Sequence, residues 1–210
     1  MKPKHLISAF AIATIASTAN AGIISFTVED GGQLSSTQAD VTEVNFNDGT
    51  IGSYTEGVEK QYAIYDSSRH GSAQPYLVSD KFLSVPNPDR NGSATFNLDD
   101  DYNYFGLYWG SVDTYNHVEF FLGGTSVGTF SGGDIAPPLV ADGNQGNHAS
   151  NRYVNFFFDG ATFDSITLTS NGYAFESDNH AYGNVSVPEP GSLALLGLGL
   201  AGLAYSRRKS

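Results

Sequence analysis

Short runs of β-branched and aromatic residues, separated by clusters of Gly, Asn, Asp and Ser, recur along the chain and most constrain its fold. This punctuation is typical of strands joined by turns, and residues 22–187 show no helix-periodic segment of any length. Sheets without covering helices must bury their faces against each other. We therefore predict an all-β, two-sheet antiparallel sandwich that is jelly-roll-like, with a barrel as the alternative. The 13% of aromatic residues also argues against intrinsic disorder.

The pattern predicts ten strands, and two glycines between two of them, Gly123 and Gly124, are suited to a tight hairpin turn. Three irregular segments, residues 67–75, 86–92 and 132–150, are long for a compact domain, and loops of this length either bind something or move. The predicted strands are Ile23–Val28, Val41–Phe46, Gln61–Tyr65, Ala94–Leu98, Tyr104–Trp109, His117–Leu122, Ser126–Phe130, Tyr153–Phe158, Phe163–Ser170 and a last strand from Ala174 toward Val185.

The first 21 residues have the three parts of a secretory signal peptide. Lys2 and Lys4 give the positive start, and residues 6–15 form the apolar run. Ala19 and Ala21 make a small-x-small cleavage site, so signal peptidase should release a chain that begins at Gly22.

The opposite end, residues 187–210, combines a proline motif, an apolar stretch and a basic tail. Residues 192–205 would reach about 21 Å as a helix, shorter than the roughly 30 Å hydrocarbon core, so we expect a short transmembrane helix. Basic residues prefer the cytoplasmic side, so the tail should stop export. The motif is Val187, Pro188, Glu189 and Pro190, and the basic tail is Arg207, Arg208 and Lys209.

In motif, helix and basic tail, the last two dozen residues resemble the PEP-CTERM sorting signal of Gram-negative bacteria, also known as the ice-binding protein C-terminal domain. The resemblance implies processing near Pro188–Pro190 by exosortase, a membrane cysteine protease. It implies export across the inner membrane, transient anchoring there, and then a place at the cell surface or in the extracellular matrix. Residues 22–186 would be the extracellular domain.

A second resemblance lies in the central domain. Residues 105–116, residues 118–121 and residues 175–179 are similar to a group of exosortase-dependent surface proteins that are regarded as jelly-roll-like. That group has no established activity, so the likeness implies architecture and location more than function.

Charge narrows the class of partner. The extracellular domain holds five basic and 21 acidic residues, a formal net charge of −16. A nucleic-acid-binding face needs Lys and Arg to neutralise phosphates, so we expect no nucleic acid partner. Cations and neutral polymers are compatible with this charge as binding partners. The chain has no Cys, and its histidines show no zinc-type spacing.

Two acidic segments are candidates for Ca²⁺, which prefers carboxylate and carbonyl oxygens from loops. Asp99, Asp100 and Asp101 place three carboxylates at the end of a predicted strand. Asp142 and Asn144 lie in an oxygen-rich loop that lacks the distal Glu of an EF-hand. Solvated acidic loops are the alternative for both segments.

Carbohydrate recognition needs aromatic faces and nearby polar groups. Tyr115, Asn116 and Asp113 lie in a predicted loop and are the candidates for glycan contact, whereas Trp109 reads as core. No nucleophile motif such as Gly-x-Ser-x-Gly occurs, and the sequence singles out no catalytic residue.

Together these features predict a non-catalytic exported surface or exopolysaccharide-matrix protein that contacts carbohydrate or Ca²⁺. The alternative is a secreted glycan-active hydrolase on a lectin-like sandwich, for which Glu119 and Glu176 are conceivable acids. An ice-binding surface would need a flat Thr-rich face, and only Thr167 and Thr169 suggest one.

Overall fold

The structure is a computed structural model and describes residues 23–87 and 89–186. Strands and turns make up this part of the chain, which contains no helix. Within the same residues there is accordingly no helix long and apolar enough to cross a membrane. The strands are β1 (Ile23–Val28), β2 (Val41–Val44), β3 (Thr55–Lys60), β4 (Ala63–Tyr65), β5 (Phe82–Val85), β6 (Gly92–Tyr102), β7 (Tyr104–Gly110), β8 (Asn116–Leu122), β9 (Thr125–Ser131), β10 (Arg152–Asp159), β11 (Phe163–Ser170) and β12 (Phe175–Gly183).

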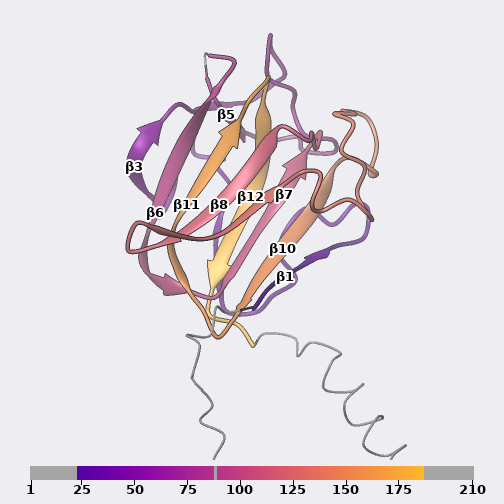
Figure 1. The fold of residues 1–210 in the computed structure, drawn as a ribbon. Helices are drawn as coiled ribbons and strands as arrows, with labels where there is room; N and C mark the ends of the chain where they lie inside the picture. Colours follow the sequence, from indigo (N-terminus) through magenta and orange to yellow (C-terminus); the bar gives the residue numbers. More distant parts are fainter. Residues whose placement is uncertain (1–22, 88, 187–210) are drawn as a thin grey trace, which may run out of the picture.

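Two antiparallel sheets pack face to face (Figure 1). The seven-stranded sheet has the order β1-β10-β7-β12-β5-β4, with β2 also paired to β12, and the five-stranded sheet has the order β3-β6-β11-β8-β9. From β5 onward the strands divide into the two halves β5-β12-β7-β10 and β6-β11-β8-β9, which is the strand order of a jelly roll. The predicted jelly-roll-like sandwich is therefore confirmed, with β1 to β4 added around it.

Aromatic side chains fill the space between the two sheets. Phe120 of β8 has no exposed surface and lies among Phe105, Phe156, Phe158 and Phe163, at ring-centroid distances of 4.9 to 5.7 Å. Edge-on and tilted ring pairs at such distances add to the free energy gained by burying the rings. Phe120 reaches this core because every second residue of β8, from Asn116 to Phe120, points into it.

The seven-stranded sheet is buried on its outer face as well. Tyr108 and Tyr153 point away from the main core and pack with Phe82 and Val78. The loop between β4 and β5 carries Val78 and lies over this face. Covering loops of this kind can shape a site against a rigid sheet.

Some strand boundaries differ from the prediction. β2 ends at Val44 rather than Phe46, β4 begins at Ala63 rather than Gln61, and β6 runs on from Leu98 to Tyr102. β3 and β5 were not predicted: β3 is a polar edge strand with mostly exposed residues, and β5 is a run of only four residues, all buried. Neither shows the half-buried alternation by which strands are recognised in a sequence.

The predicted hairpin turn is confirmed, because Gly123 and Gly124 join β8 to β9 with φ angles of 56° and 77°. Positive φ at both central positions is the requirement of a type I′ turn.

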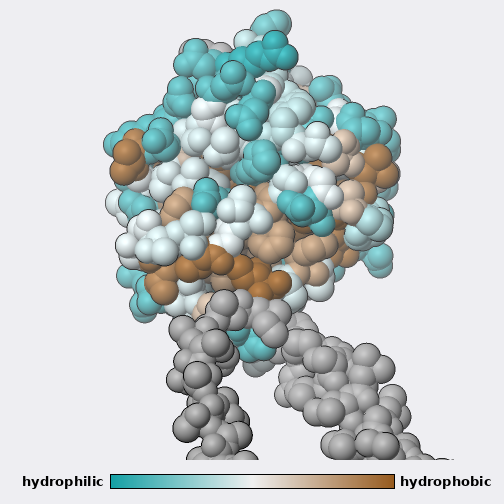
Figure 2. All heavy atoms as spheres, viewed as in Figure 1, coloured by the Kyte–Doolittle hydropathy of each residue, from teal (hydrophilic) through white to brown (hydrophobic). Residues whose placement is uncertain are grey.

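The described chain begins and ends at the same end of the domain (Figure 1). Ile23 pairs with Asp159 of β10, and Asn103 donates from its side-chain amide to the carbonyl of Val185 at 2.9 Å. The predicted signal peptide, its cleavage site at Ala19, Ala21 and Gly22, and the predicted transmembrane helix lie outside the described residues. Hydrophilic residues gather at the opposite end of the domain (Figure 2).

Candidate functional site

A cavity of about 340 Å³ opens where β7 ends and β12 begins. Four connections line it: the one between β4 and β5, the one between β7 and β8, the one between β9 and β10, and the one between β11 and β12. Two of these contain long irregular segments singled out in the sequence, residues 67–75 and 132–150. The structure therefore brings together two loops that are far apart in the chain. We call this cavity the end pocket.

Glu176, the second residue of β12, forms the buried side of the end pocket and is 2% exposed. Its carboxyl oxygens accept hydrogen bonds from the backbone N–H of Ala73 at 2.8 Å and from the Ser111 hydroxyl at 3.0 Å. Burial raises the pKa of Glu176 to about 8, against the opposing effect of these two hydrogen bonds. At neutral pH this carboxyl group is therefore mostly protonated.

Ser111 has a backbone conformation that is unusual for a residue with a side chain, with φ at +39°. Its N–H donates to the Asn151 side chain at 2.8 Å, and its hydroxyl donates to Glu176. These bonds hold the chain in a costly conformation, and such strain is concentrated at functional sites.

Asp113 and Tyr115, two of the glycan candidates, do line the end pocket. Partial burial raises the pKa of Asp113, and the neighbouring carboxylate of Asp142 raises it further. The Tyr115 hydroxyl donates to the carbonyl of Tyr173 at 2.7 Å, and Tyr173 also lines the pocket. A Cβ at Gly172 would lie 2.6 Å from the Tyr115 ring, so only glycine lets the backbone pack this closely beneath it.

Asn116, the third glycan candidate, lies beneath the surface and is fully buried. Its amide nitrogen donates to the carbonyl of Ala174 at 2.9 Å, and its amide oxygen accepts from the Ser170 hydroxyl at 2.6 Å. Both ends of the amide are therefore used within the protein, and Asn116 joins β8 to the chain before β12 rather than facing the pocket.

Arg69 is the only Lys or Arg among the residues that line the end pocket, whose acids are Asp113, Asp142 and Glu176. The Arg69 guanidinium lies 4.0 Å from the centroid of the Tyr65 ring, a cation–π contact that orients it. With Glu176 protonated, the pocket presents one cation and two ionisable carboxyl groups beside tyrosine rings. This mixture suits a ligand with many hydroxyl groups.

The calcium candidates lie apart from one another. Asp99, Asp100 and Asp101 are exposed on β6, where Asp99 accepts from the Tyr102 hydroxyl at 2.9 Å. Asp142 accepts from the Ser150 hydroxyl at 2.6 Å and from the N–H of Asn144 at 3.1 Å, which shapes its loop. In residues 23–87 and 89–186 no group of three or more His, Asp or Glu side chains is placed to hold a metal ion. Calcium at either segment stays a prediction.

Several pocket residues, among them Arg69, Ser111 and Tyr173, were not singled out in the sequence, and Glu176 was considered only as a hydrolase acid. Its conceivable partner Glu119 lies on β8 of the other sheet, so the two do not form a pair. Besides the polar loop that carries Asp113 and Tyr115, the signal in the sequence that pointed to this region was the length of two of the loops that converge here.

Comparison with known proteins identifies the C-terminal segment. Residues 186–209 match the PEP-CTERM protein-sorting motif, which contains the predicted Val187, Pro188, Glu189 and Pro190. All but Ser186 lie outside the described residues. The chain thus carries the sorting signal of an exported protein that exosortase processes and directs toward the cell surface through a transient membrane stage.

Comparisons of the whole chain give little more. No curated protein matches it in sequence. Among solved structures it is similar to the catalytic unit of a GH87 α-1,3-glucanase from Streptomyces thermodiastaticus strain HF3-3, with 14% identity, a TM-score of 0.38, and coverage of 77% of this chain and 28% of that chain. It is also similar to CpGH89CBM32-6 of Clostridium perfringens, with 13% identity, a TM-score of 0.30, and coverage of 61% and 97%. The chain therefore spans less than a third of the length of the glucanase.

Proposed function

We propose that the sandwich is a non-catalytic carbohydrate-binding domain, displayed at the cell surface or in the exopolysaccharide matrix, and that it holds a neutral saccharide in the end pocket. The observation that carries this proposal is the convergence of Asp113, Arg69 and the Tyr115 ring in one cavity. Its volume, about 340 Å³, falls in the range of roughly 300 to 1,000 Å³ that is common for small-molecule sites.

Each group has a role in this proposal. Carboxyl groups accept from sugar hydroxyls, Arg69 donates to sugar oxygens, and a tyrosine ring packs against the apolar face of a sugar. Glu176 supports a binding role because both its oxygens already accept hydrogen bonds from the protein and its side chain is buried. Its place is that of a group that shapes the pocket floor.

The first prediction tests the pocket directly. A glycan array should first identify a saccharide that binds the wild-type domain. Titration calorimetry should then show that Asp113→Asn and Tyr115→Ala each weaken the affinity for this saccharide tenfold or more, about 1.4 kcal/mol of binding free energy. Asp99→Asn is the matched control, because it removes a carboxylate that is exposed on β6, and it should leave affinity unchanged. Equal affinities for the wild type and both pocket variants would refute the assignment.

A secreted hydrolase is the second candidate, and one observation favours it. A carboxyl group that is protonated at neutral pH, as Glu176 is, near an ionisable Asp113 has the composition of a glycosidase acid pair. Product analysis of every bound saccharide separates the two candidates. Turnover that disappears in Glu176→Gln would establish the hydrolase and sink the non-catalytic proposal.

The sorting signal gives the second prediction. Deleting residues 188–190 removes the proline motif that exosortase should recognise, so the precursor should stay unprocessed in the membrane fraction instead of reaching the surface. Cell fractionation and the intact mass of a tagged chain measure this. Deleting Gly123 and Gly124 would not serve as a control, because it would break the hairpin between β8 and β9. Asp100→Asn, an exposed change in the domain, is the suitable control. Normal processing of the deletion variant would contradict the assignment.

A further inference from the structure

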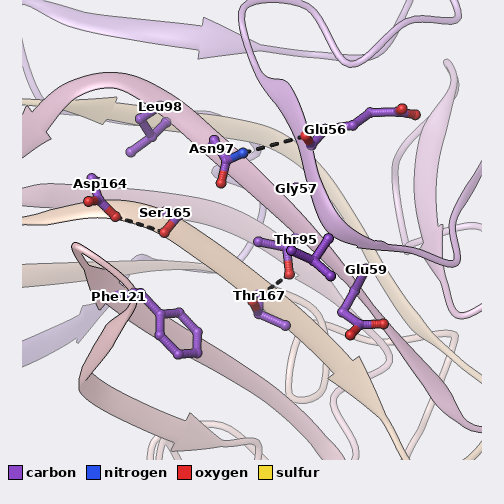
Figure 3. A pocket seen from close by; sticks show the side chains of 12 residues that line it. Glu56, Gly57, Glu59, Thr95, Asn97, Leu98, Phe121, Asp164, Ser165 and Thr167 are labelled. Atoms are coloured by element: carbon purple, nitrogen blue, oxygen red, sulfur yellow. Dashed lines mark hydrogen bonds between the residues drawn. The ribbon is translucent and has the colours of Figure 1, made fainter.

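A second, larger cavity lies on the outer face of the five-stranded sheet, away from the end pocket. It holds about 780 Å³ and is an open groove (Figure 3). Residues of β3, β6, β8 and β11 line it, together with the β8–β9 turn and Asp164 near the start of β11. We call it the sheet groove.

Hydroxyl groups form the floor of the sheet groove. Thr95 of β6 and Thr167 of β11 are paired across the strands, and their hydroxyl oxygens are 2.8 Å apart (Figure 3). Ser93 and Thr169 repeat the arrangement one pair further along, again at 2.8 Å. The Thr95 and Thr167 side chains are only partly buried, so this pair of hydroxyls keeps hydrogen-bonding capacity toward the groove.

Two irregularities in strand pairing form the sides of the sheet groove. In β3, the three residues from Gly57 to Glu59 face the single Thr95 of β6, and Val58 stands out with 90% of its surface exposed. On the other side, Asp164 faces residues 98–101 of β6. Bulges re-aim side chains and are over-represented next to functional sites. They also make this face unlike the flat, regular surface that an ice-binding face built on Thr167 and Thr169 would need.

Gly57 is required by this shape. A Cβ at position 57 would lie 2.5 Å from the Thr95 side chain, closer than any real contact. Only glycine therefore allows the bulge of β3 to lie directly beside the hydroxyl floor.

The charge of the sheet groove has one sign. Glu56, Glu59 and Asp164 line it, and Lys, Arg and His are missing from its lining residues. Lys60, next to the groove, is paired with Glu56 at 2.9 Å. An anionic polymer would be repelled here, whereas a polymer with amino groups would be attracted, and the domain's net charge of −16 acts in the same direction.

One aromatic ring completes the groove. Phe121 of β8 lines it at the end near Asp164 and Ser165, and the ring is labelled at that end in Figure 3. A partly exposed phenylalanine on a hydroxyl-rich face is a stacking surface for the apolar side of a sugar ring.

We propose that the sheet groove binds an extended polysaccharide chain that carries free amino groups. Sugar hydroxyls lie against the Thr95 and Thr167 pair, one sugar ring stacks on Phe121, and ammonium groups lie near Glu59 and Asp164. This proposal concerns a second site and does not depend on what the end pocket binds.

Titration calorimetry with three oligomers tests the proposal on the domain, residues 22–186, and on the full chain. At low salt, a glucosamine hexamer should bind at least fivefold more tightly than an N-acetylglucosamine hexamer, and an oligogalacturonate should not bind. Glu59→Gln and Phe121→Ala should each weaken the glucosamine hexamer fivefold or more, while Asp113→Asn in the end pocket leaves it unchanged. Raising the salt concentration should reduce the preference for the amine-bearing chain.

Several results would overturn the proposal. These are no binding of the glucosamine hexamer, equal affinity for its acetylated form, binding of the galacturonate, and full affinity in both groove variants. Loss of binding in Asp113→Asn alone would place the oligomer in the end pocket and would also overturn it. Thermal unfolding of each variant shows that it is folded, so that loss of binding is read as loss of contacts. If Asp113→Asn and Tyr115→Ala keep full saccharide affinity while the groove variants lose affinity for the glucosamine hexamer, the end-pocket proposal is refuted and the groove proposal is supported.

Discussion

Replacing Glu176 with glutamine should make the domain more stable than wild type at pH 8, by on the order of 4 kcal/mol, and equally stable near pH 4. Burial raises the pKa of this carboxyl from 4.5 to about 8. Between these two values the folded protein keeps a proton that the unfolded chain releases. The Glu176 contribution to wild-type stability therefore falls as pH rises, by about 1.4 kcal/mol per pH unit between these two values, and levels off above pH 8. Glutamine has no proton to lose, and its amide can still accept from Ala73.

Denaturant unfolding between pH 4 and pH 9 measures this difference. Glu59→Gln removes the same charge at an exposed position, so its curve should run parallel to that of the wild type. His180 is present in both proteins, and burial lowers its pKa from 6.5 to about 3. Its contribution to stability is lost as pH falls through that range, so it affects the acid part of both curves equally. A Glu176→Gln curve that runs parallel to wild type across the whole range would show that Glu176 is ionised in the folded state.

Truncating Phe120 to alanine should cost roughly 3 to 5 kcal/mol of unfolding free energy, the range found when a buried phenylalanine leaves a cavity. The ring is fully buried, and the four phenylalanines around it come from β7, β10 and the first residue of β11. Residues of both sheets therefore surround this ring. A shift of one sheet alone would not fill the cavity that the alanine leaves.

The adjacent Phe121→Ala is the matched control, since residue 121 points to the outer face of the same strand. It should cost about 1 kcal/mol or less while weakening ligand binding in the sheet groove. Urea unfolding of both variants measures the contrast. Similar losses at the two positions would mean that the alternation of β8 does not separate core from surface as the structure shows.

The strands that the sequence predicted well are those with two different faces. β11 begins and ends where predicted, because Ile166 and Leu168 point to the core while Thr167 and Thr169 point out. β3 could not be recognised, because an edge strand with a bulge buries almost nothing, and its Thr, Glu and Lys residues give no apolar period. β6 continues through Asp99 because a strand facing solvent tolerates charges that a buried strand would not.

The end pocket could be predicted only in part. Asp113 and Tyr115 were found because they follow an aromatic strand in a polar loop. Glu176 is hydrogen-bonded by residues far along the chain: Ser111 is 65 positions away, and Ala73 is 103 positions away. Such convergence is set by the order of strands in the jelly roll, and local patterns in a sequence do not carry it. The hydroxyl floor of the sheet groove has the same origin, since Thr95 meets Thr167 only when β6 pairs with β11.

The position of β12 has a mechanical consequence. This strand pairs with β7 on one side and with β2 and β5 on the other, and its second residue, Glu176, lies at the end pocket. Its last residue, Gly183, is three positions before Ser186, where the sorting motif begins. Tension between a ligand in the pocket and an attachment beyond Ser186 would run along this strand. The hydrogen bonds on both sides of β12 would then be loaded together in shear, so that drag on the ligand is shared among them rather than breaking them one after another.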